Sequence, residues 1–221
     1  MQWTLIVPLK PLARAKSRLA DSVPDAFRPG LVLAFAQDTV AAALASRAVR
    51  DVVVVTDDTL AGRELAGLGA RVVPDGARGR GLNAALEHGA VVVRKERQAA
   101  PLATLNADLP ALRPKELTRV LLRAAQFPRA FLPDVSGIGT TLLTALPGTE
   151  LRPLFGGASR LRHRSSGAAE LVLPGAVSVR QDVDTGRDLR AALALGVGPH
   201  TRRAAPHALG PQGPPPGDRA P

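Results

Sequence analysis

The sequence predicts a single α/β domain of the Rossmann-like type, with a mixed, mostly parallel sheet flanked by helices. Short runs of β-branched and aliphatic residues alternate along the chain with longer amphipathic stretches, a pattern typical of strand–helix–strand units. The chain has 221 residues, a length at which one domain with one complete core is expected. No internal repeat divides it further.

The first half of the chain carries the clearest alternation. Strands are expected at residues 4–7, 52–56, 71–73 and 102–105, and helices at residues 31–46, 61–68, 82–97 and 114–126. Val52–Val55 is a run of four valines, as expected for a central strand that is buried on both faces. Pro114 favours a helix start because proline fits the first helical turn.

Beyond residue 130 the pattern changes. Candidate strands at 130–133, 141–144 and 171–173 are separated by glycine-rich loops instead of long helices, which predicts some antiparallel pairing. A last helix is expected at 185–195. The domain is therefore expected to span residues 1–203, and the proline- and glycine-rich segment 204–221 is predicted to be a disordered tail.

The composition limits the class of protein. The chain has 29 Lys and Arg against 19 Asp and Glu, a net charge of +10; a high-GC genome or a phosphate-rich ligand can each explain it. Aromatic residues make up 3%, so stacking platforms for nucleic acid are scarce and a small anionic ligand is favoured. No segment resembles a membrane span or signal peptide. The absence of cysteine excludes thiolate metal sites and fits a cytoplasmic protein.

A cation-rich loop follows the first expected strand. It contains Lys10, Arg14, Lys16 and Arg18, at the edge of the sheet where open α/β domains bind ligands. These cations could neutralise a triphosphate and stabilise the charge on a leaving pyrophosphate; a solvated basic loop is the alternative. The loop lacks the glycines of a P-loop and of a dinucleotide-binding turn, so neither of those sites is expected.

Three aspartates are candidate ligands of Mg²⁺. Asp108 directly follows the strand at 102–105, and Asp182 and Asp184 would lie on one side of an extended segment. Mg²⁺ needs only one or two carboxylates when phosphates and water complete its shell. Local capping is the alternative at each place. A capping box would explain Thr185 and Asp188, but it gives Asp182 and Asp184 no role.

Three glycine-containing loops, at residues 76–83, 136–141 and 155–160, are candidate anion sites. Their backbone N–H groups and hydroxyls could surround a phosphate or a carboxylate. In the first loop, Asn83 could instead be a simple N-cap. After the third loop, His163 lies among arginines and is expected to help bind an anion rather than to act as a base; a structural or surface role is the alternative.

The order of these pieces resembles one known family. The motifs are Lys10, Lys16-Ser17-Arg18-Leu19, Gly81-Leu82-Asn83, Asp108-Leu109-Pro110, Gly139-Thr140-Thr141, Phe155-Gly156, Ser159, Arg162-His163 and Asp182-Val183-Asp184-Thr185. In this order the chain resembles the 2-phospho-L-lactate or phosphoenolpyruvate guanylyltransferases of coenzyme F-420 biosynthesis, over about residues 5–201. The resemblance implies a compact glycosyltransferase-A-like nucleotidyltransferase. It also implies attack by the acid's phosphate oxygen on the α-phosphorus of GTP, with loss of pyrophosphate.

The resemblance further implies a role for each residue. Lys16 and Asp108 would be catalytic; Lys10, Lys16, Arg18, Gly81 and Asn83 would bind the nucleotide; Thr141, Gly156 and Ser159 would bind phosphoenolpyruvate; and Asp108, Asp182 and Asp184 would hold Mg²⁺. Ile138 departs from the small or hydroxyl residue expected there. The alanine- and arginine-rich composition suggests an actinobacterial source, and through the source rather than the pocket it favours phosphoenolpyruvate over 2-phospholactate. A downstream transferase is an expected partner because the product is labile. The alternatives are a cytidylyl- or molybdopterin-type transferase and a non-enzymatic binding protein for nucleic acid or a phosphometabolite.

Overall fold

A seven-stranded sheet forms the centre of the protein, in the order β3-β2-β1-β4-β6-β5-β7. The computed structural model describes residues 1–14, 16–76 and 80–209. The strands are β1 (Trp3–Pro8), β2 (Val49–Val55), β3 (Arg71–Val73), β4 (Leu102–Leu105), β5 (Arg129–Pro133), β6 (Thr140–Ala145) and β7 (Ala169–Glu170). Within this described sheet, β6 pairs antiparallel with β4 and β5 while every other pair is parallel. The predicted mixed, mostly parallel α/β fold is confirmed.

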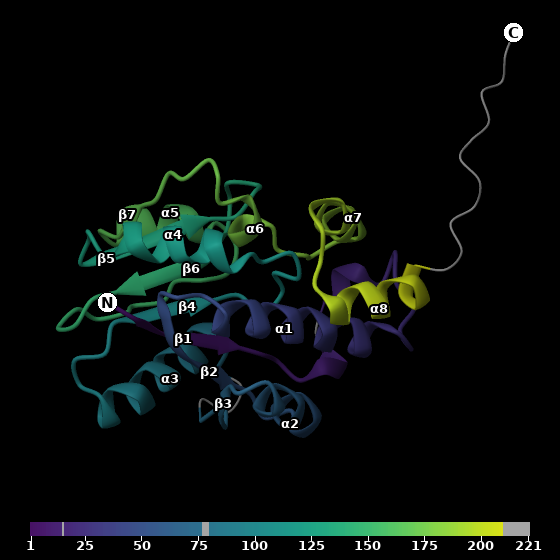
Figure 1. Cartoon of the computed structure of the whole chain (residues 1–221), viewed down its shortest axis with the longest axis horizontal. Helices are drawn as coiled ribbons and strands as arrows, with labels where there is room; N and C mark the ends of the chain where they lie inside the picture. Colours follow the sequence, from purple (N-terminus) through teal and green to yellow (C-terminus); the bar gives the residue numbers. More distant parts are fainter. Residues whose placement is uncertain (15, 77–79, 210–221) are drawn as a thin grey trace, which may run out of the picture.

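Helices cover both faces of the sheet (Figure 1). They are α1 (Arg28–Leu44), α2 (Thr59–Gly67), α3 (Leu82–Glu96), α4 (Pro114–Ala124), α5 (Ser159–Ser165), α6 (Val177–Arg180), α7 (Gly186–Leu195) and α8 (Pro199–Leu209), with two 3-10 turns, η1 (Leu12–Arg14) and η2 (Ser17–Leu19). Helices α7 and α8 lie together at one end of the molecule, with α8 against α1 (Figure 1). No helix in the described ranges has both the length and the apolar character that a membrane span requires.

The valine run is buried as expected. Val52 and Val54 pack with α1, α2 and α4 on one face of the sheet. Val53 and Val55 pack with α3 on the other face. All four are at most 1% exposed, because successive side chains of a strand point to opposite faces and both faces here carry helices.

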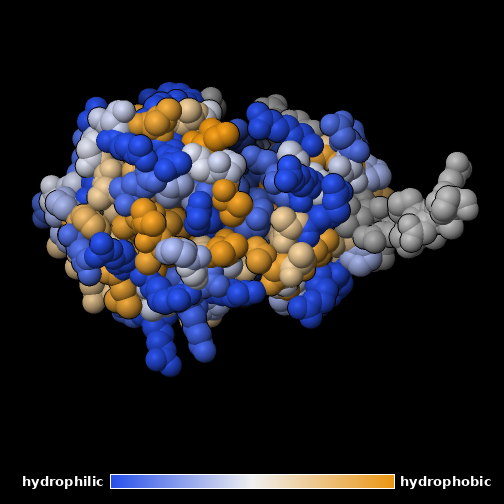
Figure 2. Space-filling model, turned by 90° about the horizontal axis from the view of Figure 1, so that it is seen from above, coloured by the Kyte–Doolittle hydropathy of each residue, from blue (hydrophilic) through white to orange (hydrophobic). Residues whose placement is uncertain are grey.

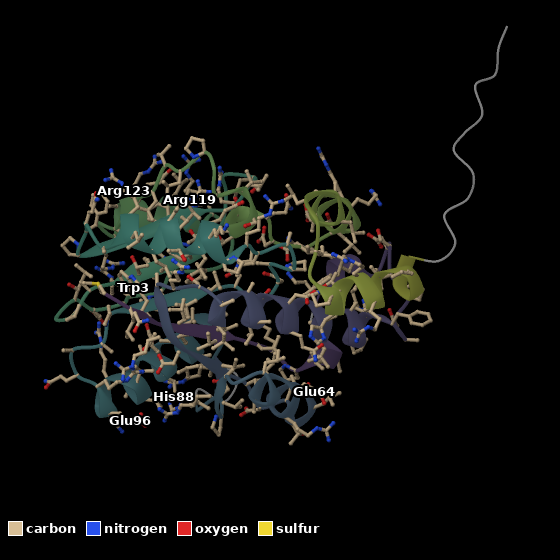
Figure 3. All side chains as sticks on the ribbon, viewed as in Figure 1. Trp3, Glu64, His88, Glu96, Arg119 and Arg123 are labelled. Carbon is tan, nitrogen blue, oxygen red and sulfur yellow. The ribbon has the colours of Figure 1, made fainter. Side chains whose placement is uncertain are left out.

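The outer faces of the helices carry the charge. Figure 3 shows Arg119 and Arg123 on the outer side of α4, and Glu96 at the end of α3. On the face seen in Figure 2, the hydrophobic residues form small separate areas among hydrophilic ones and not one continuous apolar region.

Three expectations about elements need correction. The last strand is Ala169–Glu170 and not 171–173, because Val172 is 79% exposed and the chain turns away there. The short helices α5 and α6 were not expected. The predicted tail also starts too early, since α8 continues to Leu209; residues 210–221 lie outside the described part of the chain.

Helix α8 is held by a partner distant in sequence. The buried carboxylate of Asp38, on α1, accepts the backbone N–H groups of His200 and Thr201 at 3.0 and 2.8 Å. It thereby caps the free N–H groups at the start of α8, as a local N-cap residue would. Ala205 packs into a small core with α7 and the start of α1. Segment 204–209 is therefore part of the domain.

Candidate active site

A cleft of about 380 Å³ opens where the direction of the sheet connections reverses. Strand β1 lies between β2 and β4, and ligands of open α/β sheets bind at the carboxyl ends of strands at such a point. The cleft is lined by Pro8, Leu9, Lys10, Lys16, Arg18, Val32, Leu82, Asn106, Ala107, Asp108, Asp182 and Asp184. The structure thus brings six predicted site residues together: Lys10, Lys16, Arg18, Asp108, Asp182 and Asp184. The side chain of Arg14, the fourth predicted cation, lies outside the described part of the chain.

Lys16 joins the two acidic segments of the cleft. Its Nζ donates to Oδ2 of Asp108 and to Oδ1 of Asp184. Burial alone would lower the pKa of Lys16, but the two carboxylates outweigh it and hold that pKa above its usual value. Lys16 also has a left-handed backbone, with φ of 57°, which a non-glycine residue adopts at a cost. Lys16 is therefore a fixed cation and not a base.

The carboxylates next to Lys16 are not fully compensated. Burial, together with Asp108 and Asp184, raises the pKa of Asp182 to about 8. Oδ1 of Asp108 is buried without a hydrogen-bond partner. Within the ranges that the structure describes, no three His, Asp or Glu side chains surround one point closely enough to hold a metal, and Lys16 lies between Asp108 and Asp184. Asp108 and Asp184 together carry more negative charge than Lys16 balances, and the raised pKa of Asp182 shows that a further negative charge is costly there, which suits an added cation.

Buried contacts fix the backbone of the acidic residues. Thr39 on α1 is fully buried; its Oγ accepts the N–H of Leu109 at 3.0 Å and lies 3.2 Å from the carbonyl oxygen of Ala107. The N–H of Val183 donates to the carbonyl of Asp108 at 3.1 Å. The turn after β4 and the segment 182–184 are therefore held both to α1 and to each other.

The residues predicted to bind the acid lie beside the cleft and not in its lining. Thr141 on β6 is fully buried, its hydroxyl has no hydrogen-bond partner, and its carbonyl accepts the N–H of Asn106 at 3.1 Å. Gly156 is exposed and has φ of 95°, and Ser159 begins α5. Asn106, which sequence reasoning left without a role, lines the cleft. Its position directly after a central strand was the available signal.

Asn83 connects the loop at 155–160 to the cleft. Its Oδ1 accepts the N–H of Phe155 at 2.8 Å, and its Nδ2 donates to the carbonyl of Phe155 at 3.2 Å. Gly81, with φ of 93°, is the N-cap of α3, so the alternative reading of Asn83 as an N-cap is wrong. Leu82 lines the cleft between them. Residues 77–79 of this predicted loop lie outside the described part of the chain.

His163 is a buried structural residue, so the expectation that it helps to bind an anion is wrong and the structural alternative is correct. It is 0% exposed; its ring contacts Phe131 in a tilted arrangement and Phe155 edge-on. Its Nε2 accepts the N–H of Leu154 at 3.0 Å, and its Nδ1 lies 3.0 Å from Oγ of Thr140. Both ring nitrogens are occupied, so this side chain does not bind an anion.

The loop at 136–141 also differs from its predicted role. The carboxylate of Asp134 accepts the N–H groups of Ile138 and Gly139 at 3.1 and 2.9 Å. A Cβ on Gly139 would lie 2.5 Å from Oδ2 of Asp134, so this contact requires glycine. These two N–H groups already have a partner and are not available to a phosphate.

The chain matches a known protein family along nearly its whole length. The family described as guanylyl transferase CofC like matches residues 3–204. The chain belongs to this family. A phosphoenolpyruvate guanylyltransferase of Streptomyces avermitilis is 71% identical over 215 residues, which cover 96% of this chain and 99% of the relative. The match thus includes the cleft, the loop at 155–159 and the start of α8.

Solved structures support the fold. A putative nucleotide-diphospho-sugar transferase from Desulfovibrio desulfuricans is similar with a TM-score of 0.62 and 16% identity, covering 92% of this chain and 99% of the other. A Mycobacterium tuberculosis protein in complex with manganese has a TM-score of 0.55 and 21% identity, covering 88% and 99%. At such identities the likeness extends to the fold alone.

Proposed function

We propose that this protein transfers GMP from GTP to phosphoenolpyruvate, giving enolpyruvyl-diphospho-5'-guanosine and pyrophosphate. The observation that carries the proposal is the cleft at the ends of β1 and β4, where Lys16 is fixed between Asp108 and Asp184. The 71% identity to a relative named for this reaction supports the choice of nucleotide and acid. We further propose that the reaction serves coenzyme F-420 biosynthesis in the cytoplasm.

The cleft suits a reaction between two phosphates. Both reactants are anionic, so bringing them together and stabilising the charge on leaving pyrophosphate are the main tasks. Lys10, Lys16 and Arg18 line the cleft and would bind the GTP phosphates. The Gly81–Asn83 segment would lie near the nucleoside. No covalent nucleophile is needed, because the acid's phosphate oxygen attacks the α-phosphorus and the bond to pyrophosphate breaks.

We assign the acid to Thr141, Gly156 and Ser159. The unpartnered buried hydroxyl of Thr141 could donate to an anion, and the carbonyl of the same residue accepts the N–H of Asn106, a residue of the cleft. The bond between Asn83 and Phe155 holds Gly156 close to Leu82, another lining residue. These contacts would position the acid beside the GTP site.

The cleft offers carboxylate oxygens to a divalent cation, which we propose to be Mg²⁺. Asp108, with its unpartnered Oδ1, and Asp182 and Asp184 would supply them. Because these three side chains do not surround one point in the described structure, we propose that the ion binds here only together with the GTP phosphates. Carboxylate oxygens are the ligands that Mg²⁺ prefers, with phosphates completing its shell. When bound, the ion would neutralise phosphate charge that the three lysine and arginine side chains leave uncompensated.

The decisive experiment combines two nucleotides with two acids. Pyrophosphate release is measured with GTP or CTP and with phosphoenolpyruvate or 2-phospholactate, and the product is identified by mass. Turnover with GTP and phosphoenolpyruvate is expected, and it should be lost in Lys16→Met but kept in Lys115→Met, an exposed lysine of α4. Release with CTP but not GTP would contradict the guanylyl assignment. Salt-sensitive DNA binding without any turnover would favour the non-enzymatic alternative.

A partner for the product follows from its chemistry. The enolpyruvyl diphosphate product is labile, so we propose that a downstream transferase accepts it. Adding such a transferase to the assay should raise the recovered amount of final product without changing the initial rate of pyrophosphate release. Unchanged recovery would contradict the transfer.

A further inference from the structure

A second, smaller cleft of about 300 Å³ lies around α5. It is lined by Arg152, Leu154, Leu161, Arg162, Ser165 and Ser166. None of these residues lines the first cleft. Among the described residues that line the second cleft there are two arginines and two serines but no carboxylate.

The charges on α5 are compensated unequally. Arg160 pairs with Glu170 at 2.7 Å, and Arg164 pairs with the other oxygen of Glu170. The side chains of Arg152 and Arg162 make no hydrogen bond or ion pair with any residue that the structure describes. The positive charge without a partner is therefore found in the second cleft, and not on the rest of the helix.

A third arginine lies directly behind the lining. Arg129 donates to the carbonyl and to the hydroxyl of Ser166 at 3.1 and 2.9 Å, while its Nε is buried without a partner. Burial, and the nearby charge of Arg152, hold the pKa of Arg129 below its usual value, and Glu150 opposes this only in part. Arg129 thus adds a partly buried positive charge behind Arg152 and Arg162, which are themselves exposed.

The backbone of Arg152 is in a conformation that needs support. Its φ is 48°, in the left-handed region that non-glycine residues rarely adopt. Such a conformation persists where the surroundings over-determine it, and it is frequent at ligand sites. Here one surrounding contact is the bond from Arg129 to the carbonyl of Arg152, at 3.4 Å.

We propose that the second cleft binds a small phosphate-bearing anion at a site separate from the active-site cleft. The guanidinium groups of Arg152 and Arg162 match the oxygens of a phosphate, and arginine is the side chain best suited to this recognition. Of the two serines, Ser165 can add its hydroxyl, whereas the hydroxyl of Ser166 already donates to the carbonyl of His163 at 2.7 Å. The site also adjoins the acid-binding loop. Nη2 of Arg162 lies 3.7 Å from where a Cβ on Gly156 would be, and Leu154 precedes Phe155 and Gly156 in the chain.

Binding of inorganic phosphate to the full chain tests this proposal. Titration calorimetry is run in the presence of saturating GTP, which occupies the triphosphate site. Chloride at matched ionic strength is titrated in parallel as the control anion. Wild-type protein is expected to bind phosphate, and Arg152→Gln and Arg162→Gln should each weaken binding about tenfold or more, the effect of losing one charge-assisted hydrogen bond. The matched control is Arg164→Gln, which lies on the same helix but pairs with Glu170; its affinity should stay within about twofold.

Two results would overturn the proposal. One is the absence of phosphate binding in wild-type protein. The other is equal affinity in wild type, Arg152→Gln and Arg162→Gln while all three show the same far-UV circular dichroism and melting temperature. A Cβ on Gly156 would have Nη2 of Arg162 within 4 Å but no atom of Arg152. Loss of binding in Arg152→Gln therefore separates this cleft from the acid-binding loop.

Discussion

The buried His163 should make the protein sensitive to acid. The N–H of Leu154 donates to its Nε2, so that nitrogen carries no proton, and the proton on Nδ1 can donate to Thr140. Protonation of Nε2 would place two N–H groups face to face in a fully buried site. Burial, and the charges of Arg129 and Arg162, accordingly lower the pKa of His163 to about 4.

The size of the effect follows from this shift. Because the pKa is lower in the folded state than in the unfolded chain, the stabilisation is fully present above pH 6.5 and is lost as the pH falls toward 4. A drop from 6.5 to about 4 corresponds to about 3.4 kcal/mol, at about 1.36 kcal/mol per unit. By pH 4.5, about 2.5 kcal/mol of it should be gone.

The measurement compares wild-type protein with His163→Gln in urea unfolding between pH 4.5 and 7.5. Gln can still accept the N–H of Leu154 but does not titrate, so it should be less stable than wild type near pH 7. The difference in unfolding free energy should shrink by about 2.5 kcal/mol at pH 4.5. Subtracting the variant removes the acid titration of other groups, and His200→Gln on α8 serves as control. Parallel pH profiles for wild type and His163→Gln would refute the reasoning.

Three further predictions concern the active-site cleft. Asp108→Asn should abolish pyrophosphate release without changing the circular dichroism spectrum. Near-normal activity of this variant would show that Asp108 does not bind the metal. Thr39→Val leaves the N–H of Leu109 without its partner, and it should lower the unfolding free energy by about 1–3 kcal/mol together with kcat; urea titration and initial rates test both. Gly186→Ala places a Cβ 2.1 Å from Oγ of Ser22 and should lower kcat and the melting temperature, with Ser22→Gly restoring part of each. No recovery in the double variant would contradict this steric explanation.

The parallel half of the fold and the centre of the site could be predicted because each depends on local sequence. Consecutive valines at 52–55 indicate a strand covered on both faces, and the observed strand has that burial. Lys16 and Asp108 follow strands whose carboxyl ends meet at one edge of a parallel sheet. Asp182 and Asp184 had no other role in the sequence, and they line the same cleft.

What could not be predicted depends on partners distant in sequence. The loop at 136–139 looks like an anion site until Asp134 is seen to accept its N–H groups. Among arginines, His163 suggests a ligand-binding residue, yet it is enclosed by Phe131 and Phe155. A sequence pattern shows that a group can form a hydrogen bond, but not which partner has already taken it.

The site's dependence on the C-terminal helices follows from one small core. Leu19 and Val23, which follow Lys16, pack with Val183, which lies between Asp182 and Asp184, and with residues of α7 and α8. Lys16 and Asp184 are 168 positions apart, so their pairing orders a long loop and needs contacts that offset this entropy. The buried side chains of this core supply such contacts away from the cleft. The polar groups in the cleft can therefore stay incompletely paired, as a site that must accept charged substrates requires.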